Sequence, residues 1–255
     1  MPLAEATDEA KRILEDARAN KVTLRLFGGV AIFFSCPSAR LVNSERKYVD
    51  IDVMGHAKQS KDIRKLFTDL GYAPRDRFNA MHGFRRLIFN DLEHGRRADI
   101  FLDLFEMSHK FNFKKRIDVD GYTLPLADLL ATKLQIFEIN EKDLKDALTI
   151  FVDHDVGDND SVINGAYLAD ICSNDWGIYK TFAINLDKAL GILDTTQVDS
   201  SLKELAKSRI VKFRKMLEDV SKSFRWKLRA QVGESVKWYE LPEADQEVVD
   251  SRVAH

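Results

Sequence analysis

Two glycines and three acidic residues are the side chains of this sequence whose types and spacing could do chemistry. The glycines are Gly28 and Gly29, and the acids are Asp50, Asp52 and Asp99. Glycines let a phosphate approach the backbone closely, and the amides at the start of a helix attract anions. Asp50 and Asp52 stand two residues apart, so on a strand both carboxylates point to one face. Such a pair of carboxylates suits Mg²⁺, which keeps water and phosphate in its remaining positions.

Together these residues could transfer a nucleotidyl group from a nucleoside triphosphate (NTP). The transfer needs a cradle for the phosphates, divalent metal to neutralise charge, and a base for the incoming hydroxyl. We expect the glycine pair to seat the triphosphate and Asp50 and Asp52 to hold magnesium, with two ions in the site. Asp99 would complete the metal site and act as the base. Asp103 is the competing third acid, because four residues along a strand returns to the same face, and we prefer Asp99.

Each of these features also has an ordinary interpretation. A glycine pair after a strand is usually only a turn, and an acid-apolar-acid triplet is usually a solvated strand face. The order along this chain is strand, glycine pair, helix, acid pair on a strand, and a further strand acid. This conjunction is far less common than its parts, and it favours a catalytic site.

These residues resemble the signature of the DNA polymerase beta nucleotidyltransferase superfamily, which has a glycine-glycine or glycine-serine turn, an acid-x-acid strand and a third strand acid. Residues 128–135 and 142–146 resemble the lysine-leucine and acid-x-x-acid motifs of the abortive-infection AbiE-type toxin branch, so the resemblance covers about residues 24–150. It implies that Lys133 contacts the nucleotide phosphates and that Asp146, with Asp143, supports the site. Gly29 departs from the many members that carry serine there.

Two basic residues could bind the triphosphate, and the hypothesis also requires an acceptor for the transferred nucleotide. A lysine facing a carboxylate site is a sensible phosphate ligand, and Arg46, shortly before the acid pair, is a candidate contact to the triphosphate or the acceptor. The resemblance to the toxin branch implies the 3′ end of tRNA as acceptor and an antitoxin as partner. A small hydroxylated molecule, as in antibiotic-modifying relatives, is the alternative acceptor. A catalytically silent nucleotide-binding or protein-interaction module is the alternative from another class.

The elements that must position these residues follow from the hydrophobic pattern. In the first half, helices are predicted over 6–20, 30–35 and 63–70, and strands over 22–27, 48–54, 84–89, 96–105 and 115–119. From Pro125 onward only helices are predicted, over 126–137, 142–152, 165–172, 178–193 and 202–224. We therefore expect an α+β fold, in which helices flank a mixed sheet of the nucleotidyltransferase type. The predicted domains are a catalytic domain, 1–122, and a helical domain, 123–255, with a short C-terminal tail.

The composition is that of a globular protein that can bury a core. The chain has 255 residues, 45% of them hydrophobic and 31% charged, with a formal net charge of −2. Its longest apolar run, residues 24–34, is too short to cross a bilayer, and residues 1–20 lack the pattern of a secretion signal. Cys36 and Cys172 are far apart and predict reduced thiols. The expected location is the cytoplasm, without a membrane partner.

Two further segments have mainly ordinary interpretations. Residues 151–160 are rich in aspartate, but Gly157 falls one place too early for a calcium loop and Asn164 stands where the closing glutamate should be. Basic residues dominate between Lys203 and Arg229, and Trp226, Trp238 and Tyr239 lie in or near this stretch. This stretch could bind RNA, although a solvated helix face with ordinary aromatic packing is the more common interpretation.

Overall fold

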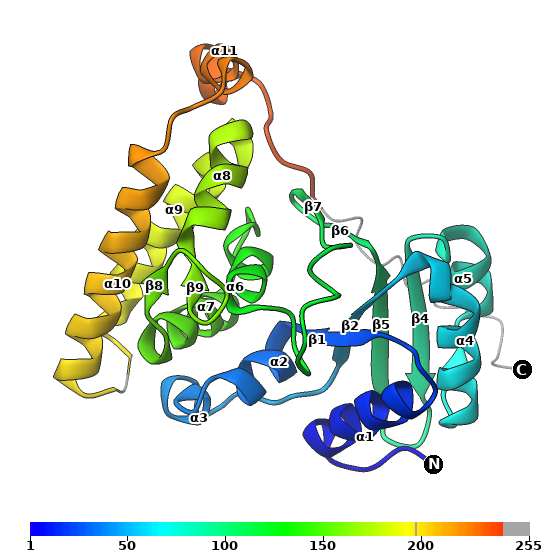
Figure 1. The fold of residues 1–255 in the computed structure, drawn as a ribbon. Helices are drawn as coiled ribbons and strands as arrows, with labels where there is room; N and C mark the ends of the chain where they lie inside the picture. The colour runs from blue at the N-terminus through cyan, green and yellow to red at the C-terminus, as the bar shows by residue number, and fades with distance from the viewer. Residues whose placement is uncertain (197, 242–255) are drawn as a thin grey trace, which may run out of the picture.

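A mixed five-stranded sheet lies on one side of the molecule and a group of helices on the other (Figure 1). The computed structural model describes residues 1–196 and 198–241, so the predicted tail at 242–255 lies outside the described part. The sheet has the strand order β1-β2-β5-β4-β3. Its strands are β1 (Leu24–Phe27), β2 (Ile51–Gly55), β5 (Arg96–Leu102), β4 (Arg86–Asp91) and β3 (Ala73–Pro74). The predicted α+β fold is confirmed.

The strand directions make this sheet mixed. Strands β2 and β5 are parallel, whereas β1 with β2, β5 with β4, and β4 with β3 are antiparallel pairs. Along β2, Ile51 and Val53 are fully buried, and Asp52 between them points to the opposite face. The sequence alternation therefore places the carboxylate of Asp52 on the face away from this apolar layer.

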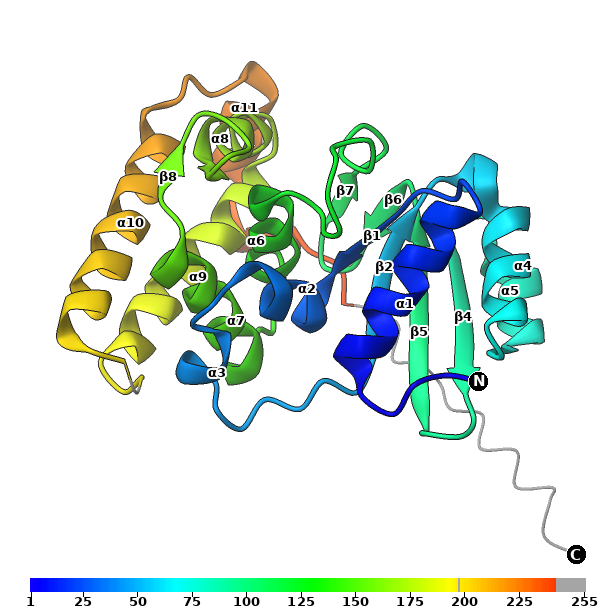
Figure 2. The ribbon, with the colours of Figure 1, turned by 60° about the horizontal axis from the view of Figure 1, so that its bottom comes forward.

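Helices α1 (Ala6–Ala19) and α4 (Ser60–Asp69) contact each other and pack along the sheet (Figure 2). The apolar residues of α1 recur at helical spacing, and Ile13, Leu14 and Ala17 are buried. On α4, Ile63 lies against the backbone of Gly55 at the end of β2. Both predicted helices are confirmed.

Helix α2 (Gly28–Ser35) begins at the glycine pair, directly after β1. It contacts β1 and β2 of the sheet and the helices α6 (Leu126–Leu134) and α7 (Glu141–Asp153) of the second half. Its place between the two groups of elements is visible in Figures 1 and 2. The short helix α3 (Ala39–Val42) follows it and contacts α7.

The second half is mainly helical, as predicted. Its remaining helices are α8 (Gly165–Asn174), α9 (Trp176–Leu193), α10 (Ser200–Asp219) and α11 (Phe224–Val232). The predicted helix over 202–224 is confirmed as far as Asp219, where α10 ends because Val220 has extended backbone. Ser223 is also extended, and its hydroxyl caps α11 by accepting from the amide of Trp226 at 3.2 Å. The small elements β8 (Val156–Gly157) and β9 (Ile163–Asn164) pair beside them.

The predicted strand over 115–119 was wrong, because these residues form turns. The predicted strand 96–105 stops at Leu102, since Asp103 adopts a left-handed φ of 58° that no regular strand contains. A short hairpin follows, formed by β6 (Leu104–Glu106) and β7 (Lys110–Asn112). The elements without a predicted counterpart include α5 (Asp76–His82) and the short 3₁₀ turns η1 (Ala57–Gln59) and η2 (Gly233–Ser235).

The segment at the predicted domain boundary is hydrogen-bonded to the sheet. The amide of Leu26 donates to the carbonyl of Tyr122 at 2.8 Å, and the amide of Leu124 donates to the carbonyl of Leu26 at 2.9 Å. One buried apolar cluster includes residues of both halves, from Ala10 to Leu217. The boundary between residues 122 and 123 stays a prediction. Within the described residues, no helix is both long and apolar enough to span a membrane.

Candidate active site

The turn between β1 and α2 brings both glycines against other predicted site residues. Gly28 has a φ of 70°, which an L side chain rarely adopts, and a Cβ there would collide with the Oδ2 atom of Asp52. A Cβ at Gly29 would collide with the Nη2 atom of Arg46. The glycine pair therefore permits the close approach of one carboxylate and one guanidinium to the first turn of α2.

Asp52 and Asp99 are register partners on the parallel strands β2 and β5. Burial raises the pKa of Asp52 to about 7, and the negative charges of Asp99 and Asp50 act in the same direction. Asp50 precedes β2 and is exposed, and its Oδ1 atom accepts a long hydrogen bond of 3.4 Å from the amide of Arg97. Asp50 and Asp52 thus lie at the start of β2, and Asp99 lies beside Asp52 in the middle of β5.

A cavity of about 640 Å³ lies beside these acids. It is lined by the predicted site residues Gly29, Arg46, Asp50, Asp52 and Lys133, which come from distant parts of the sequence. Several further charged side chains share its wall: Glu45, Lys47, Glu141, Lys142, Asp143 and Lys145. The cavity therefore combines cationic and anionic groups, as a metal-bound polyphosphate would require.

Lys133 is the centre of an ion-pair cluster between α6 and α7. Its Nζ atom lies 2.7 Å from Oδ1 of Asp143 and 2.8 Å from Oδ2 of Asp146. The Nη2 atom of Arg46 lies 3.3 Å from the same oxygen of Asp146. Burial acts to lower the pKa of Lys133, but the two carboxylates outweigh it and raise the pKa above its usual value. Lys133 is therefore a fixed positive charge at the cavity wall.

Asp99 does not line the cavity, because an arginine covers its carboxylate. Asp99 is 2% exposed, and the Nε atom of Arg86 donates to its Oδ1 atom at 2.7 Å while Nη2 donates to Oδ2. The Nη2 atom of Arg97 lies 3.6 Å from the same Oδ2 atom. Arg86, on β4, is a residue of this site that the sequence analysis missed. A possible signal was that the predicted strands 84–89 and 96–105 are joined by a turn and would pair.

Asp103, the competing third acid, lies apart from this arrangement. Its amide donates to the carbonyl of Gly55 at 2.9 Å, beyond the last paired residues of β2 and β5, and its Oδ1 atom lies 3.1 Å from Nδ1 of His56. The other ring nitrogen of His56 lies 2.8 Å from Asp118. Register with Asp52 therefore favours Asp99 over Asp103 as the neighbouring acid.

The carboxylates at the cavity suit one magnesium ion that also binds water and substrate phosphates, rather than an ion held by protein side chains alone. Among the described residues, no group of three or more His, Cys, Asp or Glu side chains is arranged to hold a metal. Two carboxylates, Asp50 and Asp52, do face the cavity, and Mg²⁺ is commonly bound through one or two carboxylates together with substrate phosphates. Burial raises the pKa of Asp52, and a bound divalent cation would favour its ionised form.

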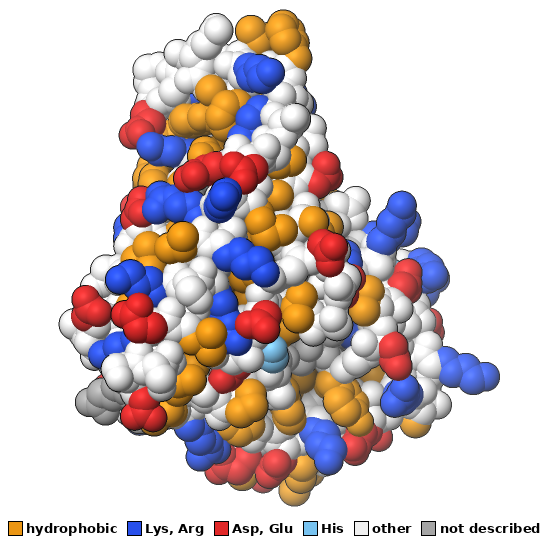
Figure 3. All heavy atoms as spheres, turned by 60° about the vertical axis from the view of Figure 1, so that its left-hand side comes forward, with side chains coloured by type: hydrophobic (Ala, Val, Ile, Leu, Met, Phe, Trp, Pro, Cys, Tyr) orange, Lys and Arg blue, Asp and Glu red, His pale blue; other side chains and the backbone are white. Residues whose placement is uncertain are grey.

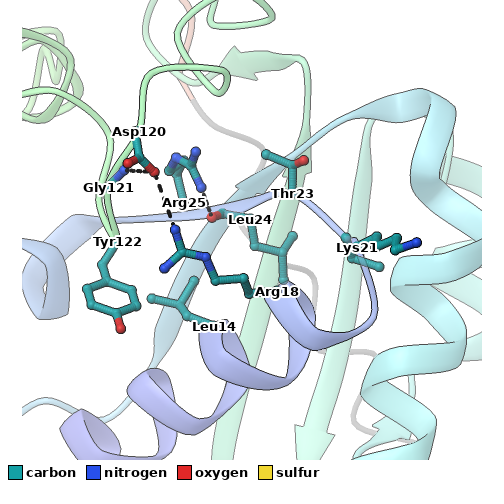
Figure 4. Close-up of a pocket in the computed structure, with 10 residues that line it drawn as sticks. Leu14, Arg18, Lys21, Thr23, Leu24, Arg25, Asp120, Gly121 and Tyr122 are labelled. Carbon is teal, nitrogen blue, oxygen red and sulfur yellow. Dashed lines mark hydrogen bonds and ion pairs between the residues drawn. The ribbon is translucent and has the colours of Figure 1, made fainter.

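A second cavity, of about 300 Å³, lies between the end of α1 and the start of β1 (Figure 4). Its apolar side chains include Leu14 and Leu24, and Arg18 at its edge lies 3.8 Å from Asp120. Lys21 extends away from this pair in Figure 4. None of the lining residues is a predicted site residue.

The basic stretch from Lys203 to Arg229 is largely engaged within the protein. Arg214 binds Asp187 through two nitrogens, Arg209 binds Asp155, and Lys212 donates to the carbonyl of Val156 at 2.6 Å. Figure 3, which brings the left-hand side of Figure 1 forward, shows Lys and Arg side chains interspersed with Asp and Glu rather than gathered in one patch. RNA binding by this stretch stays a prediction.

The two cysteines and the aspartate-rich loop have structural surroundings. Cys36 and Cys172 are free, as predicted, and both are buried, which raises the pKa of both thiols. In the loop after α7, Asp155 pairs with Arg209 at 2.6 Å and Asp160 pairs with Arg116 at 2.7 Å. The aspartates of this acidic loop thus form ion pairs with arginines.

No protein-family model matches the sequence, and no curated protein matches it. Two solved structures are similar to the chain. The lincosamide antibiotic adenylyltransferase LnuA in its lincomycin-bound crystal structure has a TM-score of 0.40 and 17% identity, with 58% of this chain and 97% of that chain covered. The antibiotic-resistance factor ANT(2'')-Ia has a TM-score of 0.37 and 12% identity, with 56% of this chain and 80% of that chain covered. At these scores neither likeness bears on the activity of this chain.

Proposed function

We propose that the protein is a magnesium-dependent nucleotidyltransferase, which moves a nucleoside monophosphate from an NTP to a hydroxyl acceptor and releases pyrophosphate. The observation that carries the proposal is the cavity of about 640 Å³, whose wall combines Gly29, Arg46, Asp50, Asp52 and Lys133. A cavity with paired carboxylates, fixed cations and the start of a helix has the parts that a metal-bound triphosphate needs.

Each group has a proposed role. The amides at the start of α2, freed of side chains at Gly28 and Gly29, would seat the phosphates. Asp50 and Asp52 would hold magnesium, which when bound neutralises negative charge on the phosphate oxygens. Lys133 would offset the charge of the triphosphate. Lys133, its two carboxylate partners and Arg46 form one network of ion pairs, so a phosphate that binds Lys133 would compete with these carboxylates.

In the proposed reaction, the oxygen of the acceptor hydroxyl forms a bond to the α-phosphorus. The bond from this phosphorus to the oxygen of the β-phosphate breaks, and pyrophosphate leaves with the electron pair. The hydroxyl proton leaves to a base or to water. Positioning and charge stabilisation dominate such transfers, because their transition states are loose. The role of Asp99 as third carboxylate and base stays a prediction, since Arg86 donates to both of its oxygens.

The acceptor belongs to the same proposal. The 3′ end of tRNA follows from the resemblance to the toxin branch, in which case an antitoxin would be a partner, and a small hydroxylated molecule is the alternative. The test is incubation with each NTP labelled at the α-phosphate, with magnesium, bulk tRNA and small hydroxylated acceptors. We expect label to enter one acceptor with the wild type and not with Asp52→Asn. The control Asp158→Asn removes an exposed acid in a loop outside the cavity and should stay active. Turnover that survives Asp52→Asn would overturn the assignment.

One observation favours a second candidate, a catalytically silent nucleotide-binding module. The carboxylate of Asp99 is held by Arg86 and is thereby withdrawn from metal and substrate. Thermal unfolding with each NTP, with and without magnesium, separates the two candidates. Stabilisation by NTP that depends on magnesium, together with turnover, supports the enzyme. Stabilisation by NTP without any turnover supports the silent module, and no response to NTP or magnesium rejects nucleotide binding.

A further inference from the structure

Arg86 pairs with the carboxylate of Asp99 from β4, the strand that flanks β5 on the side away from β2. Arg86 lies on β4 two residues from Ile88, the register partner of Asp99, so its side chain is on the same sheet face as Asp99. Its Nε and Nη2 atoms donate to the two carboxylate oxygens of Asp99, in the parallel two-bond geometry that arginine and carboxylate favour. Asp99 in turn neighbours Asp52 across β2 and β5.

The guanidinium is held in place by more than this pair. Its central carbon lies 4.8 Å from the ring centre of Phe101 and 5.8 Å from that of Phe78, both within the range of cation–π attraction. Asp99 is 2% exposed, so removing the arginine would leave a buried carboxylate with too little compensation. A second metal ion at Asp99 would therefore have to displace a charge that is already paired and packed.

The other two acids differ from Asp99. Asp50 and Asp52 face the cavity, while Asp99 does not line it. The three predicted acids thus divide into an accessible pair, Asp50 and Asp52, and a covered third acid, Asp99. An arginine carries one fixed positive charge that does not leave at any physiological pH, so it can replace part of the charge that a second ion supplies.

We propose that the guanidinium of Arg86 takes the place of a second divalent cation beside Asp99, so that the site binds one ion, through Asp50 and Asp52. This inference rests on the proposed function. It replaces the expectation of two ions with one ion and an arginine. Asp99 then serves as the anchor of Arg86 and is a positioning residue rather than a metal ligand.

The test is a count of bound Mn²⁺ by electron paramagnetic resonance, with a non-hydrolysable NTP analogue at saturation and the full chain. For the wild type we expect one tightly bound ion per chain, with any second ion at least about tenfold weaker. In Arg86→Gln, Asp99 loses the guanidinium that donates to both of its oxygens and keeps the more distant Arg97 at 3.6 Å, so a second ion should bind with an affinity within about tenfold of the first. Arg85→Gln is the matched control, since Arg85 is exposed and pairs with Glu106 at 2.7 Å.

The outcomes separate this inference from the proposed function. No bound ion in the wild type would overturn both. Two ions of similar affinity in the wild type would overturn the inference and leave the proposed function standing. One ion in the wild type and still one in a folded Arg86→Gln protein would also overturn it. If Arg86→Gln does not fold, the number of Mn²⁺ ions bound by the wild type still tests the proposal. The proposal excludes two ions of equal affinity in the wild type.

Discussion

Replacing Asp52 by asparagine should stabilise the metal-free protein at neutral and alkaline pH while it abolishes nucleotidyl transfer. Asparagine has nearly the shape of aspartate but carries no charge. Burial and the neighbouring acids raise the pKa of Asp52 from 3.8 to about 7 in the folded protein. The folded state therefore disfavours the ionised carboxylate more than the unfolded chain does, and the substitution removes this penalty.

The magnitude follows from the pKa difference. At about 1.4 kcal/mol per pH unit, a rise from 3.8 to about 7 corresponds to at most about 4 kcal/mol of lost stability above pH 7. Because the carboxylate opens onto a cavity in which solvent ions screen its charge, we expect about 1 to 2 kcal/mol. The penalty is absent below pH 4, where the carboxyl is protonated in both states, grows as pH rises toward 7, and levels off above it.

The assay is thermal unfolding of wild type and Asp52→Asn between pH 4 and pH 8 in a metal chelator. We expect equal melting temperatures near pH 4 and a variant that melts about 2 to 8 °C higher at pH 8, given about 2 to 4 °C per kcal/mol for a chain of this size. Added magnesium with NTP should stabilise the wild type and not the variant. A variant that is less stable than the wild type at pH 8 would refute the reasoning, because the carboxylate would then be stabilising.

The remaining predictions concern the glycine turn and the buried lysine. Gly28→Ala should lower stability by about 2 to 4 kcal/mol and abolish NTP binding, because the φ of Gly28 is 70° and the new methyl group collides with Asp52. The control is Gly95→Ala, where φ is 64° but the space around the residue is open. In denaturant unfolding this control should lose only about 1 kcal/mol of stability, and it should still bind NTP. Lys133→Met should lower stability by about 2 to 4 kcal/mol, because Asp143 and Asp146 lose the lysine between them and Asp146 keeps the more distant Arg46, and it should raise the KM for NTP. Lys142→Met at the same cavity should change stability by less than about 0.5 kcal/mol.

The sequence was sufficient for the parts of the site that depend on local periodicity. A strand that alternates buried and polar residues fixes the face of Asp52, and a glycine pair after a strand predicts the turn into α2. The positive φ of Gly28 and its close approach to Asp52 explain why glycine is needed there. The placement of Lys133 and Asp146 depended on the resemblance to known motifs, because local periodicity does not say which helix faces a sheet.

Arg86 was missed because its role depends on strand register. The predicted strands 84–89 and 96–105 implied an antiparallel pair, but the pairing of Ile88 with Asp99 follows from the length of the turn between them, which the sequence fixes only to within a few residues. A register shift of one residue would have placed Arg86 on the other face of the sheet.

The strand and helix ends were missed for local backbone reasons. The left-handed conformation of Asp103 ends β5 early, although its side chain continues the alternating pattern. Likewise, the cap at Ser223 begins a new helix within a segment whose composition suits one continuous helix. In both cases a backbone conformation at one residue overrode the pattern of its neighbours.

The most direct test of nucleotidyl transfer compares NTP labelled at the α-phosphate with NTP labelled at the γ-phosphate, in the presence of magnesium and the acceptor identified by screening. The proposal predicts that the α-label remains on the acceptor and that the γ-label leaves as pyrophosphate, with both events lost in Asp52→Asn. Transfer of the γ-label to the acceptor, or release of the γ-label as single phosphate while no α-label is transferred, would contradict it.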